Sequence, residues 1–269
     1  AAERPAVMAG SNLYWGHAEG ELRELIEALG IPVFLNGMGR GCLPPDHELF
    51  FSRSRGAALK DADVALVIGV PLDFRLGFGG ARLIHLDVAP MGLDKARTPD
   101  LTMVGDIAAS LTQIREAAGP GKGATVNWVE SLRSIETEKV AEEKEMLDDP
   151  RSPLHPMRIY RELLDFLDRD AIVVGDGGDF VSFAGRVMET WQPGCWMDPG
   201  PYGCLGAGPG QAIGAKLAHP DRQVCLLMGD GAFGELRPAL ERAFASGKPA
   251  LVNVLCDPEV AYPRRANLA

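Results

Sequence analysis

The chain has 269 residues, of which 46% are hydrophobic and 24% charged, and its formal net charge at pH 7 is −10. This length allows two domains that each bury a core, whereas the acidic balance argues against DNA or RNA as a partner. The five cysteines are scattered and lack CxxC spacing, which favours reduced thiols in a cytoplasmic protein. We expect no membrane span, because no apolar run reaches ~18 residues, and no leader peptide is recognised.

Residues 1–122 alternate short apolar runs with amphipathic stretches, which is typical of a Rossmann-like domain with a parallel sheet. The clearest helix covers residues 21–29, because its leucine and isoleucine side chains recur at helical spacing and Gly30 suits its C-cap. Asp106 is expected to cap the last helix of this domain. The other elements predicted here are strands at 5–10, 31–35, 64–70 and 83–88 and helices at 54–60 and 107–117.

Residues 123–154 are interpreted as a linker that carries one charged helix, from about 128 to 147. Trp128, Leu132 and Ile135 form a narrow apolar stripe, so the helix is expected to lie on the surface between two domains. The charged run from 136 to 145 is interpreted as the solvated face of this helix.

Residues 155–269 read as a second α/β domain, with Pro156 in the first turn of a helix and strands at 171–174, 224–228 and 251–255. The first two strands end in Gly-Asp-Gly turns, at 175–177 and 229–231. Ligands of open parallel sheets bind at these strand ends. Glycine lets backbone N–H groups approach an anion, and aspartate can hold a hard cation, so a diphosphate with Mg²⁺ suits both features. An ordinary strand-end turn with a helix cap is the alternative.

Between the two turns, residues 194–214 contain seven glycines and run from a loop into a helix. Such a stretch allows a helix N-terminus and bare backbone to lie against a flat polar ligand. A glycine-rich helix packed closely on a sheet is the alternative interpretation.

The order of these motifs resembles the cofactor-binding domain of thiamine-diphosphate enzymes, and in particular the acetolactate synthase group in its actinobacterial form. The residues that carry the likeness are GDGGDF (175–180), PGPYGCLGAGPGQAIGAKLAHPDRQV (199–224), LLMGDGAFG (226–234) and DPEVAYPRRANLA (257–269). The first domain is similar to the central domain of the same group through residues 36–47 and 62–79. The resemblance covers nearly the whole chain and implies an α/β fold of two domains with mainly parallel sheets.

The resemblance also implies roles for single residues. Asp230 corresponds to a ligand of Mg²⁺, and Leu205 to the bulky residue that holds thiamine in its bent shape. The other cofactor-binding positions that it implies are Gly178, Asp179, Phe180, Gly203, Cys204, Gly229, Gly231, Ala232 and Phe233.

By the same resemblance, the protein decarboxylates a 2-keto acid such as pyruvate and joins the product to a second keto acid, as in branched-chain amino acid biosynthesis. A 2-hydroxyacyl-CoA lyase or an oxalyl-CoA decarboxylase on the same fold is the alternative, and an inactive or regulatory remnant is another. The family builds its sites between subunits, which implies a dimer or a tetramer.

In these relatives the central domain holds FAD in the synthases and an adenine nucleotide or CoA in the acyl-CoA lyases. Arginines suit diphosphates because the guanidinium offers paired donors. The candidates for such a site are Arg40, Arg53, Arg55, Arg75 and Asp87, with solvated surface arginines and a turn-capping aspartate as the alternative.

The chain departs from the family in two places. In the family a further domain supplies the activating glutamate, and no residue of this sequence is expected to take that role, so no catalytic residue is assigned. After Gly234 the sequence continues at once with residues 235–238 (ELRP), which resemble a much later part of the family. We therefore expect that a segment is missing between Gly234 and Glu235.

Overall fold

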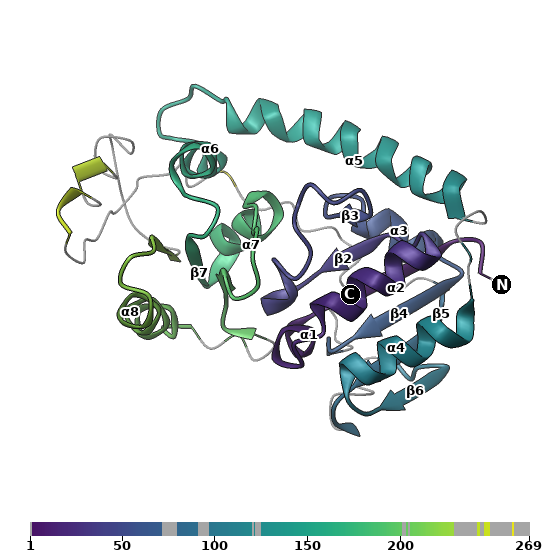
Figure 1. Ribbon diagram of the computed structural model, residues 1–269. Helices are drawn as coiled ribbons and strands as arrows, with labels where there is room; N and C mark the ends of the chain where they lie inside the picture. Colours follow the sequence, from purple (N-terminus) through teal and green to yellow (C-terminus); the bar gives the residue numbers. More distant parts are fainter. Residues whose placement is uncertain are drawn as a thin grey trace.

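The structure is a computed structural model and describes residues 2–71, 80–90, 97–119, 121, 125–200, 203, 205–228, 241–242, 245–247 and 260, without the side chains of 178–180. These residues form two α/β units, one built on a six-stranded sheet and the other on a three-stranded sheet (Figure 1). All strand pairs within the described residues are parallel. The predicted fold class is confirmed.

The central domain has a doubly wound sheet in the order β3-β2-β1-β4-β5-β6. Its strands are β1 (Pro5–Ala9), β2 (Val33–Leu35), β3 (Phe50–Phe51), β4 (Val64–Ile68), β5 (Arg82–Asp87) and β6 (Leu101–Val104). The direction of winding reverses between β1 and β4, and a crevice for ligands is expected at the carboxyl ends of the strands there.

Helices cover both faces of this sheet because neighbouring residues of each strand point to opposite sides. They are α1 (Ser11–Trp15), α2 (Glu19–Leu29), α3 (Arg55–Asp61) and α4 (Ile107–Ala118), with a 3-10 turn, η1 (Gly37–Gly39). In β1, Val7 packs on the side of α2 and α4, whereas Met8 packs on the side of α3. Two predicted caps are confirmed: Gly30 has φ 67, and Asp106 accepts the N–H of Ala109.

The long helix α5 (Val126–Leu147) crosses the top of both units in Figure 1. Its predicted apolar stripe packs on the central domain through Trp128 and Leu132. The prediction of a solvated charged face is wrong for Glu136 and Glu143, which are 7% and 1% exposed. These two residues lie two turns apart and turn inward, because each carboxylate receives hydrogen bonds from another part of the chain.

Glu136 binds the turn that follows β3. Its carboxylate accepts five hydrogen bonds, from the backbone N–H groups of Ser52, Arg53 and Ser54 and from both serine hydroxyls, at 2.8–3.2 Å. Burial alone raises the pKa of Glu136, but the hydrogen bonds from these three residues outweigh it and hold that pKa below its ordinary value. The charged carboxylate of Glu136 therefore helps to hold α5 on the turn at residues 52–54.

The second unit has a sheet in the order β8-β7-β9. Its elements are α6 (Pro156–Phe166), β7 (Ile172–Asp176), α7 (Gly178–Val187), β8 (Trp196–Met197), α8 (Gly208–Ala218) and β9 (Val224–Met228). Pro156 lies in the first turn of α6, as predicted. The predicted strand at 251–255 lies outside the described residues.

The two domains meet closely around Gly41 and Gly194. Gly41 has φ +85, and a Cβ atom there would lie 2.1 Å from the carbonyl oxygen of Gln192. A Cβ at Gly194 would lie 3.0 Å from the Tyr14 hydroxyl. The guanidinium of Arg40 reaches across the seam and lies 5.1 Å from the centre of the Trp196 ring. Backbone packing thus determines how the domains approach each other at this point.

Three cysteines in the described residues, Cys42, Cys195 and Cys225, are free and buried, as the sequence predicts for packed thiols. Burial raises the pKa of Cys42 and of Cys225 to about 12. Of the helices that the structure describes, none combines the length and the apolarity needed to cross a membrane.

Candidate functional site

The first Gly-Asp-Gly turn closes the carboxyl end of β7 against the glycine-rich loop. The carboxylate of Asp176 is 4% exposed and accepts the backbone N–H of Gly208 at 2.8 Å and of Gly206 at 3.0 and 3.1 Å. A Cβ at Gly208 would lie 2.6 Å from the Cβ of Asp176. Both carboxylate oxygens of Asp176 accept backbone amides. Asp176 therefore holds the start of α8 at the end of β7.

Leu205 extends from this loop over the turn. It is 74% exposed, and a Cβ at Gly177 would lie only 2.5 Å from its Cδ2 atom. Gly177 has φ 81, a conformation that glycine adopts without strain, and α7 begins at the next residue. An exposed apolar side chain, a glycine turn and the N-terminus of a ten-residue helix therefore meet at one strand end.

This arrangement fits thiamine diphosphate. Backbone N–H groups at a helix N-terminus favour a diphosphate, and Leu205 offers an apolar support for a ring. Asp176 is not suited to hold the metal, because its oxygens accept amide hydrogens. Among the described residues no three side chains of metal-binding type gather. The second Gly-Asp-Gly turn, at 229–231, lies outside the described residues.

The predicted cofactor positions divide into two groups. Gly203, with φ 62, and Leu205 lie in the glycine-rich loop, and Gly178, Asp179 and Phe180 form the first turn of α7. The loop and the helix meet at the end of β7. The remaining positions lie outside the described residues: Cys204, Gly229, Asp230, Gly231, Ala232 and Phe233.

A second set of polar groups occupies the reversal point of the central sheet. Asp87 ends β5, is 3% exposed, and accepts the side-chain amide of Asn12 at 2.7 Å and the N–H of Val88 at 2.7 Å. Asn12 belongs to α1, which follows β1. A Cβ at Gly69, with φ +59, would lie 2.5 Å from the Cβ of Asn12. At this edge of the central sheet, Asn12 packs tightly against both Asp87 and Gly69.

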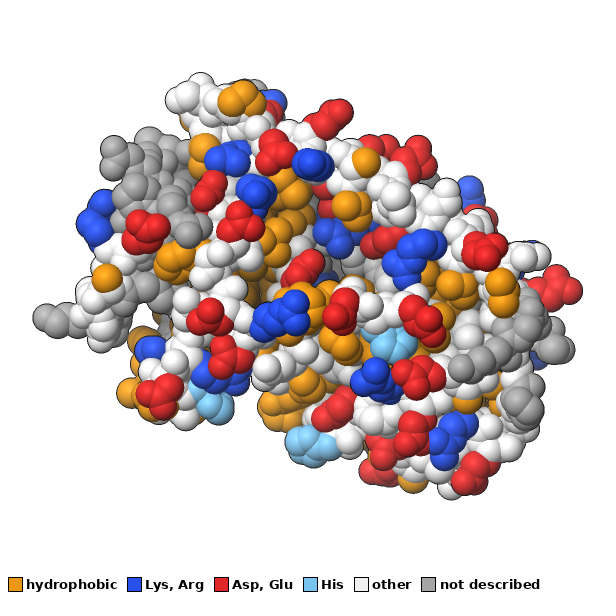
Figure 2. All heavy atoms as spheres, turned by 45° about the horizontal axis from the view of Figure 1, so that its top comes forward, with side chains coloured by type: hydrophobic (Ala, Val, Ile, Leu, Met, Phe, Trp, Pro, Cys, Tyr) orange, Lys and Arg blue, Asp and Glu red, His pale blue; other side chains and the backbone are white. Residues whose placement is uncertain are grey.

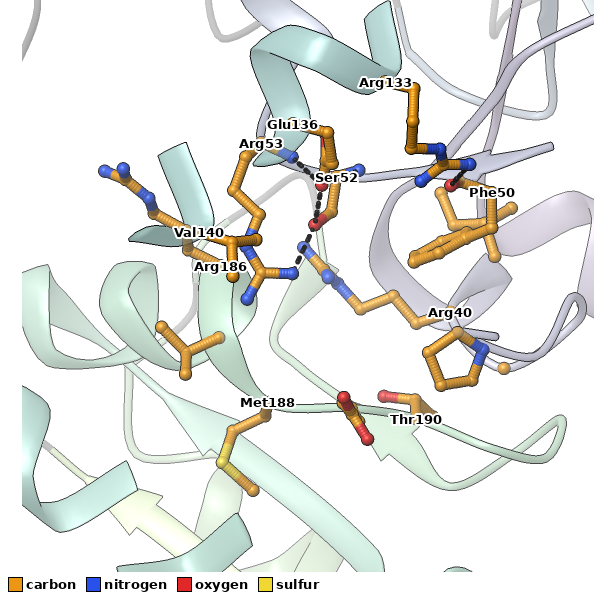
Figure 3. Close-up of a pocket in the computed structure, with 15 residues that line it drawn as sticks. Arg40, Phe50, Ser52, Arg53, Arg133, Glu136, Val140, Arg186, Met188 and Thr190 are labelled. Carbon is orange, nitrogen blue, oxygen red and sulfur yellow. Dashed lines mark hydrogen bonds between the residues drawn. The ribbon is translucent and has the colours of Figure 1, made fainter. Parts of the chain in front are cut away.

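The predicted nucleotide residues are not all in one place. Arg40 and Arg53 line a cleft of about 180 Å³ between the central domain, α5 and the end of α7 (Figure 3). Arg55 lies at the start of α3, Asp87 lies at the reversal point, and neither lines this cleft. Arg75 lies outside the described residues.

The space-filling view gives the setting of these residues. Acidic and basic side chains are scattered over this face, and hydrophobic side chains gather in the hollow between the two lobes (Figure 2). The cleft carries four arginines, and at its side Arg133 donates to the carbonyl oxygen of Glu48 at 2.5 Å. Glu136 and Glu189 also line the cleft, so its arginines face two carboxylates and also bind other parts of the protein.

The sequence matches two family profiles. The profile described as the central domain of thiamine pyrophosphate enzymes matches residues 1–114, and the one described as their C-terminal TPP binding domain matches residues 176–255. The chain therefore belongs to the thiamine pyrophosphate enzymes.

Among curated proteins, the acetolactate synthase large subunit IlvG of Mycobacterium tuberculosis and a probable acetolactate synthase of Mycobacterium bovis are each 45% identical to the chain over its full length. A 2-hydroxyacyl-CoA lyase 2 of Caenorhabditis elegans is 37% identical over 87% of the chain and 38% of its own length. The chain spans 62% of the length of the two mycobacterial relatives. The mycobacterial alignment has 342 positions against 269 residues here, so 73 of its positions have no residue in this chain.

Two groups of site residues carry no signal in the sequence. The motif predicts Asp176 only as part of a turn, whereas its carboxylate holds the glycine-rich loop. The second group is Glu136 and Glu143, whose charges look like those of any exposed helix face. Their partners lie 82 to 90 residues earlier in the chain, apart from one partner of Glu143 that lies 43 residues later, and no local pattern signals such pairs.

Proposed function

We propose that the protein is an acetolactate synthase-like enzyme that uses thiamine diphosphate and Mg²⁺ to decarboxylate a 2-keto acid and join the product to a second keto acid. The observation that carries this proposal is the 45% identity, over the whole chain, to a relative named as an acetolactate synthase large subunit. The match of the TPP-binding profile to residues 176–255 supports the cofactor.

Each part of the site has a separate task in this proposal. When bound, thiamine diphosphate supplies the reactive carbon and accepts the electron pair that decarboxylation releases. The first turn of α7 receives the diphosphate through its backbone N–H groups, and Asp230 ligates Mg²⁺. Leu205 would give the thiamine an apolar support, and Asp176 keeps the loop that carries Leu205 in place.

The direct test is calorimetry of the full-length protein with thiamine diphosphate and Mg²⁺. We expect binding that depends on Mg²⁺, and a loss of about tenfold or more in affinity for Asp230→Ala, since a carboxylate ligand carries much of the attraction to a hard cation. Asp221→Ala serves as the matched control because Asp221 is exposed. Equal affinity of wild type and Asp230→Ala would refute the metal assignment, and absence of binding by wild type would refute the cofactor assignment.

A 2-hydroxyacyl-CoA lyase is the second candidate, favoured by the 37% identity to a relative of that name over 87% of the chain. FAD bound by the central domain supports the synthase, whereas binding of CoA or ADP supports the lyase. Titration with FAD, ADP and CoA, followed by flavin fluorescence and calorimetry, separates the two.

Two further parts of the proposal concern the whole protein. The 73 alignment positions without a residue here support one or more internal segments missing from this chain, and the order of motifs in the sequence suggests that one of them follows Gly234. Mass spectrometry of the purified protein tests this. We also propose a dimer or tetramer, which light scattering tests. An assay of acetolactate formation from pyruvate distinguishes an enzyme from an inactive remnant.

A further inference from the structure

One buried carboxylate joins the two domains. Glu143 of α5 is 1% exposed and accepts a hydrogen bond from Nε of Arg53 at 2.9 Å and another from Nε of Arg186. Arg53 belongs to the central domain, just after β3, and Arg186 lies in the last turn of α7. In Figure 3 the two arginines lie on either side of Val140, at one end of the cleft. Glu143 is thus a shared partner of two cations from two domains.

The same face of α5 is attached to the central domain at three earlier positions. Arg133 donates to the carbonyl of Glu48 and lies 4.0 Å from the centre of the Phe51 ring. Glu136 binds the turn 52–54, and Lys139 donates to the carbonyl of Arg53 at 3.0 Å. This part of α5 is therefore held on the central domain, and Glu143 extends the attachment to α7.

Helix α7 connects this contact to the cofactor end of β7. It has ten residues, hence a length of about 15 Å, and it begins directly after Gly177. Arg186 is at the opposite end from the turn that receives the diphosphate. Since a short helix moves as a rod, the position of its last turn determines the direction in which its first N–H groups point.

We propose that Glu143 is a positioning residue for cofactor binding. By holding Arg186 next to Arg53, it fixes α7 relative to the central domain and so aligns the N–H groups of residues 178–180 with the diphosphate. This proposal rests on the proposed cofactor function. Without the charge of Glu143, the two guanidiniums repel each other in a partly buried site, so α7 turns away from its bound orientation.

The first experiment compares the affinity of the chain for thiamine diphosphate with Mg²⁺ between wild type and Glu143→Gln. Glutamine keeps the size of the side chain and removes its charge. We expect about tenfold weaker binding for Glu143→Gln, the size of a typical coupling between contacting groups, and a smaller loss for Arg186→Lys, which keeps the cation. Glu142→Gln, on the exposed side of α5, is the matched control and leaves the affinity unchanged. Equal affinity of Glu143→Gln and wild type overturns the proposal.

The second experiment needs no cofactor and so separates this proposal from the proposed function. Amide hydrogen exchange of α7 is measured in the same variants. Exchange in α7 rises several-fold in Glu143→Gln while α6 keeps its wild-type rate, because only α7 loses its attachment. Unchanged exchange in α7, or an equal rise in α6 and α7, overturns the positioning role even if the wild-type chain binds no thiamine diphosphate. If Glu143→Gln does not fold, Arg186→Lys tests the same attachment, with a smaller expected rise of exchange in α7 and none in α6.

Discussion

Both sheets carry an aspartate at the carboxyl end of a strand, Asp87 on β5 and Asp176 on β7, and both are almost fully buried. They differ in their partners. Asp87 accepts a hydrogen bond from the side chain of Asn12 and from the N–H of the next residue, Val88. Asp176 accepts hydrogen bonds from the backbone of a loop thirty and more residues later in the chain, at Gly206 and Gly208.

This difference shows that the position of a residue in a sheet does not determine its task. In the central domain, the side chain of Asp87 at the end of β5 binds the side chain of Asn12. The backbone on either side does not depend on this bond, because other short contacts hold it. In the cofactor domain, a side chain determines the path of the backbone, and the exposed Leu205 depends on that path. Substitutions in the two regions should therefore differ in what they disturb.

The largest effect is expected for Asp176→Ala. The change leaves two amides at a buried site without their charged acceptor, which we expect to lower the free energy of unfolding by about 3 kcal/mol. Urea denaturation measures this, with Asp221→Ala at an exposed site as control. A loss no larger than that of the control would mean that the loop holds its path without Asp176.

The next effect is expected for Gly177→Ala. A residue other than glycine at φ 81 costs about 1–2 kcal/mol, and the added Cβ also meets Leu205. The double variant Gly177→Ala/Leu205→Ala removes the contact and keeps the backbone cost. Thermal unfolding of both variants separates the two causes, and full recovery in the double variant would show that the backbone is not strained.

A smaller effect, about 1 kcal/mol, is expected for Asn12→Ala, because it removes one hydrogen bond between side chains in the central domain. Affinity for thiamine diphosphate should remain at the wild-type value. A large loss of that affinity in calorimetry would show that the end of β5 and the cofactor site are not independent.

The smallest effect on stability is expected for Leu205→Ala. With the side chain 74% exposed, the free energy of unfolding should change by less than about 0.5 kcal/mol. Its affinity for thiamine diphosphate should nevertheless fall, since the apolar support is removed. If calorimetry shows unchanged affinity, Leu205 does not contact the cofactor.

The sequence predicted the elements whose side chains repeat regularly. Strand β9 was predicted with its observed bounds, and the caps of α2 and α4 were found because capping depends on one local residue. Strands β3 and β8 have two residues each, too short for any alternation to be recognised. Strand β6 has four residues and is largely exposed, so it lacks an apolar run.

The candidate site was predictable only in part. Its glycines follow a recognisable order, so the Gly-Asp-Gly turn at 175–177 and the glycine-rich stretch were singled out from the sequence. The helix α7 itself was not predicted, because its first residues belong to the glycine motif. Contacts such as Asn12 with Asp87, 75 residues apart, or Arg53 with Glu143, 90 residues apart, depend on the folded chain and have no local pattern.

The seam at Gly41 has a consequence for how this protein can vary. A single methyl group at this position would overlap the carbonyl oxygen of Gln192. Gly41→Ala therefore pushes the two domains apart at this point. Each domain has its own core, and both cores reach this seam, through Cys42 next to Gly41 and through Trp196. A substitution at Gly41 is therefore expected to change how the two domains approach each other although glycine contributes no side chain to either core.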